Sequence, residues 1–167
     1  DFGNVSVAAL GRQLRLEAGA IDEQTTGYGI SVSGRLKIGE KDDVRFSASG
    51  GKGMGRYIGL NAANGAAIDP LNGDLDAIKS YGGLLAWRHP LNEATRLSVG
   101  YSGLWVDNPD YLPMSSTKQV QSAMAAILWD ATKYVTFGLE YMIGERKTEA
   151  GDKGRINRGT FSAKLTF

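Results

Sequence analysis

The sequence of 167 residues predicts an all-β, antiparallel transmembrane β-barrel, and three observations support this fold class. Apolar and polar residues alternate along eight segments, which is the period-two pattern of strands. Short polar turns alternate with longer connections, as they do at the two rims of outer-membrane barrels. Aromatic residues gather near the strand ends, where a membrane has its two interfaces.

The segment 155–167 shows the alternation most clearly. One face carries Phe161, Ala163, Leu165 and Phe167, and the other carries Thr160, Ser162, Lys164 and Thr166. Such a strand separates an apolar medium from a polar one, and if every strand repeats the pattern the apolar side faces lipid. A terminal aromatic residue such as Phe167 also resembles the carboxy-terminal ending of bacterial outer-membrane barrels.

We expect eight strands in a single unit that covers residues 1–167. Their approximate ranges are 3–17, 27–39, 44–59, 81–91, 96–106, 119–130, 134–146 and 155–167. In the first, Val5 and Val7 share one phase whereas Leu10 and Leu14 share the other, so we expect a β-bulge or a change of environment there.

The later strands keep one apolar phase. The apolar sets are Tyr28, Ile30, Val32, Leu36 and Ile38, then Val44, Phe46 and Ala48, then Tyr81, Leu85 and Trp87, then Leu97, Val99, Tyr101 and Trp105, then Ala125, Ile127 and Trp129, and finally Val135, Phe137, Leu139, Tyr141 and Ile143. The opposite faces are dominated by small residues such as Ser, Gly and Ala, which disfavours a solvated sheet exterior.

The connections fall into two classes. Residues 40–43, 92–95 and 131–133 are short turns, whereas 18–26, 60–80, 107–118 and 147–154 are longer or irregular, and 60–80 is the longest loop. We expect membrane-interface aromatics in two belts: Phe46, Trp87, Trp129 and Phe167 toward the short turns, and Tyr28, Tyr57, Tyr81, Trp105 and Tyr141 toward the loops.

Composition excludes several classes of function. The 19 basic and 18 acidic residues nearly cancel, so no global field indicates a nucleic-acid partner. The absence of cysteine excludes disulfides, thiolate metal sites and cysteine nucleophiles. No run of about 18 apolar residues could form a transmembrane helix. Because the chain starts at Asp1 without Met or a signal peptide, we expect a processed or cut N-terminus.

The alternation places a surplus of cations on the polar, inward face. These residues are Arg35, Lys37, Arg45, Arg88, Arg96, Arg146, Arg158 and Lys164, against Glu140 and Asp130. An eight-stranded barrel has an interior that side chains fill, so buried charges there would need partners. A wider aqueous lumen keeps the cations hydrated, and a basic lumen attracts anions and repels cations.

Several stretches resemble the DcaP-like outer-membrane porins. They are 3–12, 39–43, 55–57, 77–83, 138–141 and 151–158, with the Phe-Ser-Ala-Lys ending at 161–164. The resemblance implies a sixteen-stranded, homotrimeric porin of the bacterial outer membrane that passes small anionic solutes, dicarboxylates among them. Eight strands are half of sixteen, so we expect this chain to correspond to the second half of such a porin.

Two alternatives remain open at this point. One is a closed eight-stranded outer-membrane barrel with a structural, adhesion or binding role, which would require the inward arginines to find carboxylate partners. The other is a soluble β-sandwich with the faces inverted, which would need no detergent.

The remaining motifs do not indicate catalysis. The glycine-rich run 50–55 lacks the spacing of phosphate-binding loops, and 69–76 lacks the register of a calcium loop. If the long loop folds into the lumen, Asp69, Asp74 and Asp76 would face the basic wall at a constriction. His89 is the single histidine, so a Ser-His-Asp triad and a histidine metal cluster are not expected. We expect no enzyme activity, no metal and no cofactor, and lipid and small anionic solutes as partners.

Overall fold

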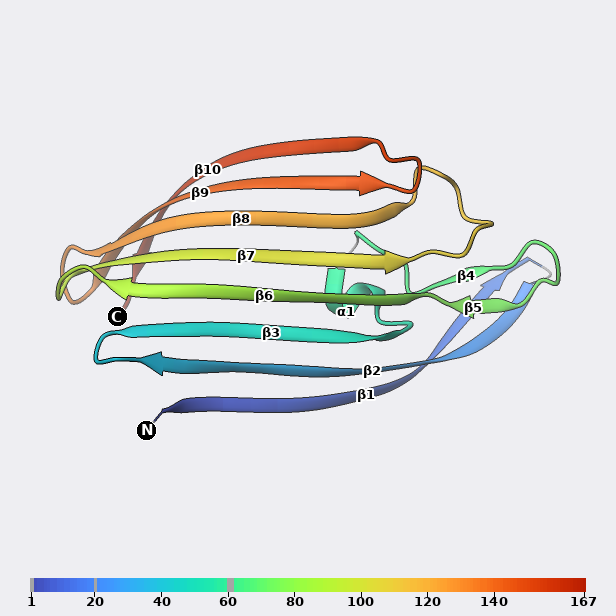
Figure 1. Ribbon diagram of the computed structural model, residues 1–167, viewed down its shortest axis with the longest axis horizontal. Coiled ribbons are helices and arrows are strands. Elements are labelled where there is room, and N and C mark those ends of the chain that lie inside the picture. The colour runs from blue at the N-terminus through green and yellow to red at the C-terminus, as the bar shows by residue number, and fades with distance from the viewer. Residues whose placement is uncertain (1, 20, 60–61) are drawn as a thin grey trace.

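A computed structural model describes residues 2–19, 21–59 and 62–167, and these form one long antiparallel sheet (Figure 1). Within the described residues the sheet has eight strands in the order β1-β2-β3-β6-β7-β8-β9-β10. The strands are β1 (Gly3–Ala18), β2 (Ile21–Ile38), β3 (Asp42–Lys52), β6 (Lys79–Pro90), β7 (Thr95–Asp107), β8 (Thr117–Asp130), β9 (Val135–Thr148) and β10 (Lys153–Leu165). A short helix, α1 (Gly55–Gly59), and a hairpin of β4 (Ala66–Ile68) and β5 (Leu75–Ala77) lie between β3 and β6.

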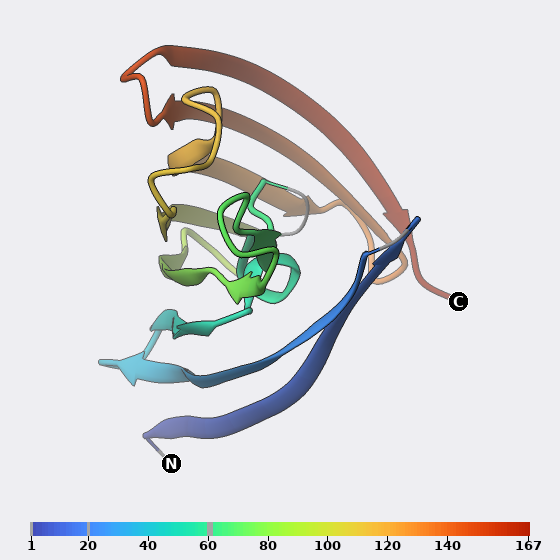
Figure 2. The ribbon, with the colours of Figure 1, turned by 90° about the vertical axis from the view of Figure 1, so that its right-hand side faces the viewer.

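The sheet curves into a trough, and seen from its loop end it wraps around α1 and the β4–β5 hairpin (Figure 2). Among the described residues β1 and β10 are the two edges and do not pair with each other. The expected all-β antiparallel class is therefore confirmed, but the sheet is open. Closure of this chain on itself as an eight-stranded barrel is not observed.

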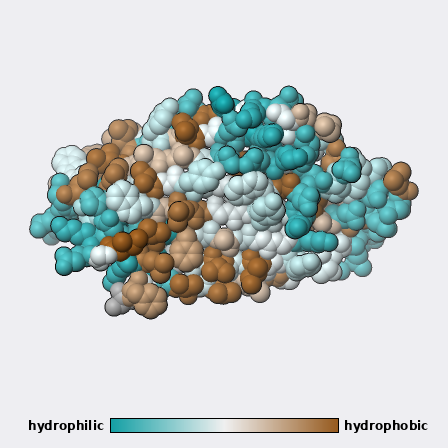
Figure 3. Space-filling model, in the orientation of Figure 1, coloured by the Kyte–Doolittle hydropathy of each residue, from teal (hydrophilic) through white to brown (hydrophobic). Residues whose placement is uncertain are grey.

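The two faces of the trough differ in chemistry. Leu85, Val99, Ile127 and Leu139 are exposed apolar residues on the convex face. In Figure 3, apolar side chains gather over the middle and the turn-side part of the visible face, whereas hydrophilic ones dominate the opposite, loop end. No helix in the described residues is long and apolar enough to cross a membrane.

The second strand begins six residues earlier than expected. We expected a loop at 18–26, but β1 and β2 stay paired up to Ala18 and Ile21. Polar cross-strand pairs hold this extension, since Gln13 Nε2 donates to Gln24 Oε1 at 2.8 Å and Arg15 Nε donates to Asp22 Oδ1 at 2.6 Å. Because residues 22–26 are all polar, apolar and polar residues do not alternate there, and the sequence did not indicate a strand.

The third strand ends at Lys52 rather than at residue 59. Gly53 follows with φ +72°, a backbone conformation that favours glycine, and the chain turns inward to form α1. Tyr57 thus lies in α1 inside the trough and not in a membrane-interface belt as expected. The loop 60–80 is also corrected, because its described part contains the β4–β5 hairpin.

The change of phase in the first strand reflects its environment. The β1–β2 register runs without a shift from Gly3 to Ala18, so no bulge is present in this pair. Leu14 lies against Gly53 and Gly65, and Leu10 lines a depression with Met54. Leu10 and Leu14 are apolar on the inward face of β1 because the segment after β3 covers them.

Buried apolar residues are few and gather where the inserted segment meets the wall. Ala63, Ile78, Leu104 and Val106 form this cluster, and Ile58 and Val120 pack against it. The cluster fixes the inserted segment to β6 and β7, and most of the remaining apolar surface lies on the convex face.

Candidate functional site

The strand registers place the eight predicted cations on one face of the sheet. In the strand register, Arg35 of β2 lies opposite Arg45 of β3, and Arg88 of β6 lies opposite Asp43 of β3. The same parity continues through the later registers to Arg96, Arg146, Arg158 and Lys164, and Lys37 lies opposite Asp43. This face is the concave one, since α1 packs against it.

Three of these arginines converge on one buried carboxylate at the turn end of the trough. Asp43 is 3% exposed. Arg45 Nε donates to Asp43 Oδ1 at 2.9 Å, and Asp43 Oδ2 lies 3.1 Å from Arg35 Nη2 and 3.7 Å from Arg88 Nη1. The three guanidinium side chains remain 37–51% exposed, so they keep contact with water. One negative charge thus orients three positive charges toward the hollow.

Asp43 was missed in the sequence because the segment 40–43 reads as a polar turn. The structure places Asp42 and Asp43 at the start of β3, where adjacent residues point to opposite faces. Asp42 lies on the convex side, where it accepts from Trp87 Nε1 at 2.9 Å and contacts His89 Nδ1 at 2.6 Å. Two adjacent acidic residues precede Arg45 in the sequence. Because Asp43 is two residues before the inward Arg45 in the same strand, the period-two pattern could have placed the Asp43 carboxylate inward.

The other predicted cations have separate surroundings. Arg96 Nη1 donates to Asp130 Oδ2 at 2.7 Å, and Thr136 donates to Asp130 Oδ1 at 2.6 Å. Arg158 lies 3.3 Å from Glu140. Arg146 of β9 donates to Thr117 Oγ1 and to the Ser115 carbonyl at the loop end, whereas the Asp43 cluster lies at the turn end of β2, β3 and β6. Lys164 is exposed near the end of β10.

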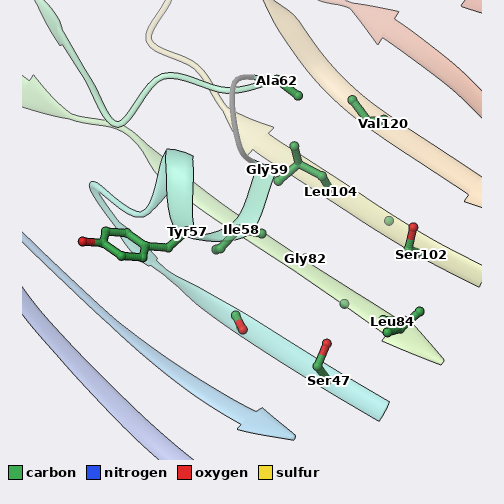
Figure 4. A pocket seen from close by; sticks show the side chains of 13 residues that line it. Ser47, Tyr57, Ile58, Gly59, Ala62, Gly82, Leu84, Ser102, Leu104 and Val120 are labelled. Carbon is green, nitrogen blue, oxygen red and sulfur yellow. The ribbon is translucent and has the colours of Figure 1, made fainter. Parts of the chain in front are cut away.

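The helix α1 occupies the middle of the trough against β6 and β7. A Cβ atom at Gly82 would lie 2.6 Å from Ile58 Cγ2 and 2.9 Å from the Gly103 carbonyl oxygen, so only glycine permits this approach. A pocket of about 330 Å³ remains between helix and wall, lined by Ser47, Ser102 and Leu104 among others (Figure 4). The free cross-section of the trough is therefore reduced at this level.

Two further cations lie in or near the hollow and were not predicted. Arg12 lies on the inward face of β1, with its Cζ 5.2 Å from the centre of the Tyr57 ring, and Arg56 is exposed in α1. Arg12 lies on the same face of β1 as Leu10 and Leu14. The shift of the apolar residues to that face in the first strand was therefore the sequence feature that could have indicated an inward Arg12.

The three expected constriction carboxylates lie in and beside the β4–β5 hairpin. This hairpin projects at the loop end of the sheet (Figure 1), so Asp69, Asp74 and Asp76 do not meet the Asp43 cluster at the turn end. Tyr111 donates to Asp76 Oδ2 at 2.9 Å. Partial burial, together with Asp76, raises the pKa of Tyr111 to about 12. The contact joins the hairpin to the 108–116 connection across the mouth.

The remaining expected aromatics lie on the convex face or at its ends. Tyr81 and Trp105 stack with ring centres 5.9 Å apart toward the loops. Trp129, Phe137 and Phe161 stack in series toward the turns at 6.0 Å spacing. Phe46, Trp87, Tyr28 and Tyr141 share the outward parity, and Phe167 is exposed beyond β10. In the described residues no group of three or more His, Cys, Asp or Glu is placed to hold a metal ion.

A carboxylate ties the loops together at the same end. Glu149 accepts from Asn108 Nδ2 at 3.0 Å and from Lys118 Nζ at 2.9 Å. These two donors hold the pKa of the Glu149 carboxyl below its usual 4.5. A depressed pKa means that the contact contributes stability above pH 4.5 and loses it as the pH falls through the lower, folded-state pKa.

Acidification is accordingly expected to loosen the 108–116 connection. As the pH falls from 4.5 through the lower pKa of folded Glu149, the protection of this connection from hydrogen exchange, corrected for intrinsic rates, should fall on the order of fivefold relative to pH 7, since a hydrogen bond to a charged group is lost. Glu149→Gln should show the reduced protection already at pH 7. A variant with the same acid-induced step as the wild type would assign the step to another group.

The fold is similar to that of the outer membrane channel DcaP of Acinetobacter baumannii, with a TM-score of 0.78 and 22% sequence identity. The match covers 96% of this chain and 47% of that one, so the chain spans about half the length of the channel. No protein-family model and no curated protein sequence matches the chain. The resemblance to DcaP-like porins expected from the sequence is thus confirmed at the level of the fold.

Proposed function

We propose that the chain forms part of the wall of a diffusion channel in a bacterial outer membrane, which passes small, preferably anionic solutes such as dicarboxylates. The convergence of Arg35, Arg45 and Arg88 on Asp43 is the observation that carries this proposal. It leaves an excess of positive charge facing the hollow, whereas the opposite face of the same strands is apolar. Such an arrangement attracts anions into a lumen and presents the outer surface to lipid.

We further propose that the chain supplies eight strands of a sixteen-stranded barrel. The edges β1 and β10 are not paired with each other, and unpaired backbone groups are costly inside a bilayer. The likeness to one half of a longer channel supports the same arrangement. Additional strands between β10 and β1 would complete the hydrogen bonding of both edges and give the wide lumen that hydrated arginines need. A homotrimer of such barrels follows from the resemblance to the porin family, and no chemical reaction is proposed.

Neutralising two arginines of the cluster tests the selectivity. In a planar bilayer under a potassium chloride gradient, the wild type should show an anion-selective reversal potential, and Arg45→Gln combined with Arg88→Gln should move it toward zero. The reason is that the counter-ion excess in a charged pore follows the fixed charge of its wall. Arg15→Gln is the matched control, because Arg15 pairs with Asp22 at the exposed end of the β1–β2 hairpin. An unchanged potential in the double variant would remove the cluster from the selectivity role.

A further inference from the structure

The convex face carries two cross-strand pairs of lysines at its loop end. Lys52 of β3 lies opposite Lys79 of β6, and Lys147 of β9 lies opposite Lys153 of β10. Directly opposed residues have Cβ atoms about 4.5–5.5 Å apart, so like charges at such positions repel. The close spacing of each pair therefore calls for a nearby negative charge.

Both pairs have a carboxylate on a neighbouring strand, but among the described residues only one of them makes an ion pair with it. Lys153 Nζ lies 3.0 Å from Glu145 Oε1. Lys52 and Lys79 have no ion pair within 4.0 Å in the described part of the chain, and Asp107, which is opposite Lys79 on β7, makes none either. The convex row of Lys52, Lys79 and Asp107 thus has a net charge of +1, and neither lysine makes a close ion pair within the described protein.

Both lysines point outward and are accessible. Ile78 and Ser80 flank Lys79 and are 1% and 0% exposed on the inward face, whereas Lys79 itself is exposed. Lys52 is likewise exposed beside the buried Gly53. A ligand of this pair would therefore approach from the convex side and not through the lumen.

Aromatic residues surround the pair on the same face. Tyr28 lies opposite Lys52 on β2, and Tyr81 follows Lys79 by two residues and stacks on Trp105. Aromatic rings of this kind sit at the headgroup level of a membrane, with their polar ends toward water. The two lysines are level with Tyr28 and lie one step beyond Tyr81 and Trp105, which corresponds to the depth of lipid phosphates.

We propose that Lys52 and Lys79 bind the phosphate of a phosphorylated glycolipid of the outer leaflet, with Tyr81 and Trp105 against the lipid body. The assignment rests on the proposed function, because it places the loop end of the strands at the outer leaflet. A phosphate between the two ammonium groups supplies the close counter-charge that neither lysine has within the described protein and balances the net positive charge of the row. The cross-strand lysines thereby form a lipid site that is separate from the inward arginines.

Native mass spectrometry of the full chain in a neutral detergent, titrated with diphosphorylated lipid A, tests this site. We expect Lys52→Gln combined with Lys79→Gln to weaken lipid binding by about tenfold or more. Lys52→Arg with Lys79→Arg should retain it. The matched control is Lys133→Gln, because the Lys133 ammonium lies 4.7 Å from the Tyr134 ring centre at the opposite, turn end.

The outcomes separate this site from the channel. Weakened lipid binding with an unchanged reversal potential in the glutamine variant supports the lipid site whether or not the arginines control selectivity. Wild-type lipid affinity in that variant overturns it, even if the channel conducts. Equal binding of dephosphorylated lipid A, or full displacement of the lipid by inorganic phosphate at a similar concentration, also overturns the assignment to a lipid phosphate.

Discussion

Replacing Asp43 with asparagine is expected to destabilise the turn end of the sheet by about 1–3 kcal/mol, because three guanidinium groups lose their shared counter-charge. Asp43 is buried, and its oxygens lie 2.9 to 3.7 Å from Arg35, Arg45 and Arg88. An asparagine of the same shape would turn an amide N–H₂ toward groups that only donate hydrogen bonds. The urea midpoint of unfolding in detergent, followed by intrinsic tryptophan fluorescence, would report the loss.

The same substitution should affect selectivity in the opposite direction from loss of an arginine. Removing one negative charge adds to the net positive charge of the concave face, so in the proposed channel a folded Asp43→Asn variant should have a reversal potential shifted toward stronger anion selectivity. Asp22→Asn is the control for both effects, because the Arg15–Asp22 pair is exposed and such pairs contribute little. Equal destabilisation by the two substitutions would show that Asp43 does not hold the cluster together.

The Asp43 cluster illustrates which features of the site the alternation of residues could predict and which it could not. Arg45 and Arg88 share a face because side chains in strands alternate, which is a local rule that the sequence displays directly. Their convergence on Asp43 depends on the register of β2, β3 and β6, which brings together residues 35, 43, 45 and 88. Register is a tertiary property, so the cluster was not predictable even though its arginines were proposed.

Departures from the predicted elements have a similar origin. The β1–β2 extension is held by cross-strand contacts of Gln13, Arg15 and their partners, whose polar character is typical of loops. Tyr57 follows an alternating segment, but the positive φ of Gly53 redirects the chain inward before it. In both cases the alternation of apolar and polar residues does not indicate which other part of the fold lies against the segment. The open edges of β1 and β10 were likewise not evident from eight alternating segments, since these fit both an open and a closed sheet.

In the proposed channel, loosening α1 is expected to change conduction more than any single wall substitution. The helix lies in the middle of the trough, where Ile58 packs beside Gly82 and against the cluster that contains Leu104. Truncating Met54 and Ile58 to alanine removes the apolar groups that hold the helix to the wall. A loss of about 1–3 kcal/mol in docking, converted at 1.4 kcal/mol per tenfold, raises the undocked population by roughly one to two orders of magnitude.

Single-channel recording of the Met54→Ala, Ile58→Ala variant should therefore show a higher mean conductance with added fluctuations, because the undocked helix clears the pocket beside Ser47 and Ser102. Ile58→Val is the control, since it keeps most of the buried volume and should leave the conductance near the wild-type value. Hydrogen exchange of residues 54–59 separates the two possible failures. Increased exchange with unchanged conductance would show that α1 moves but does not limit flow, and the narrowest point would then have to lie elsewhere along the arginine-lined wall.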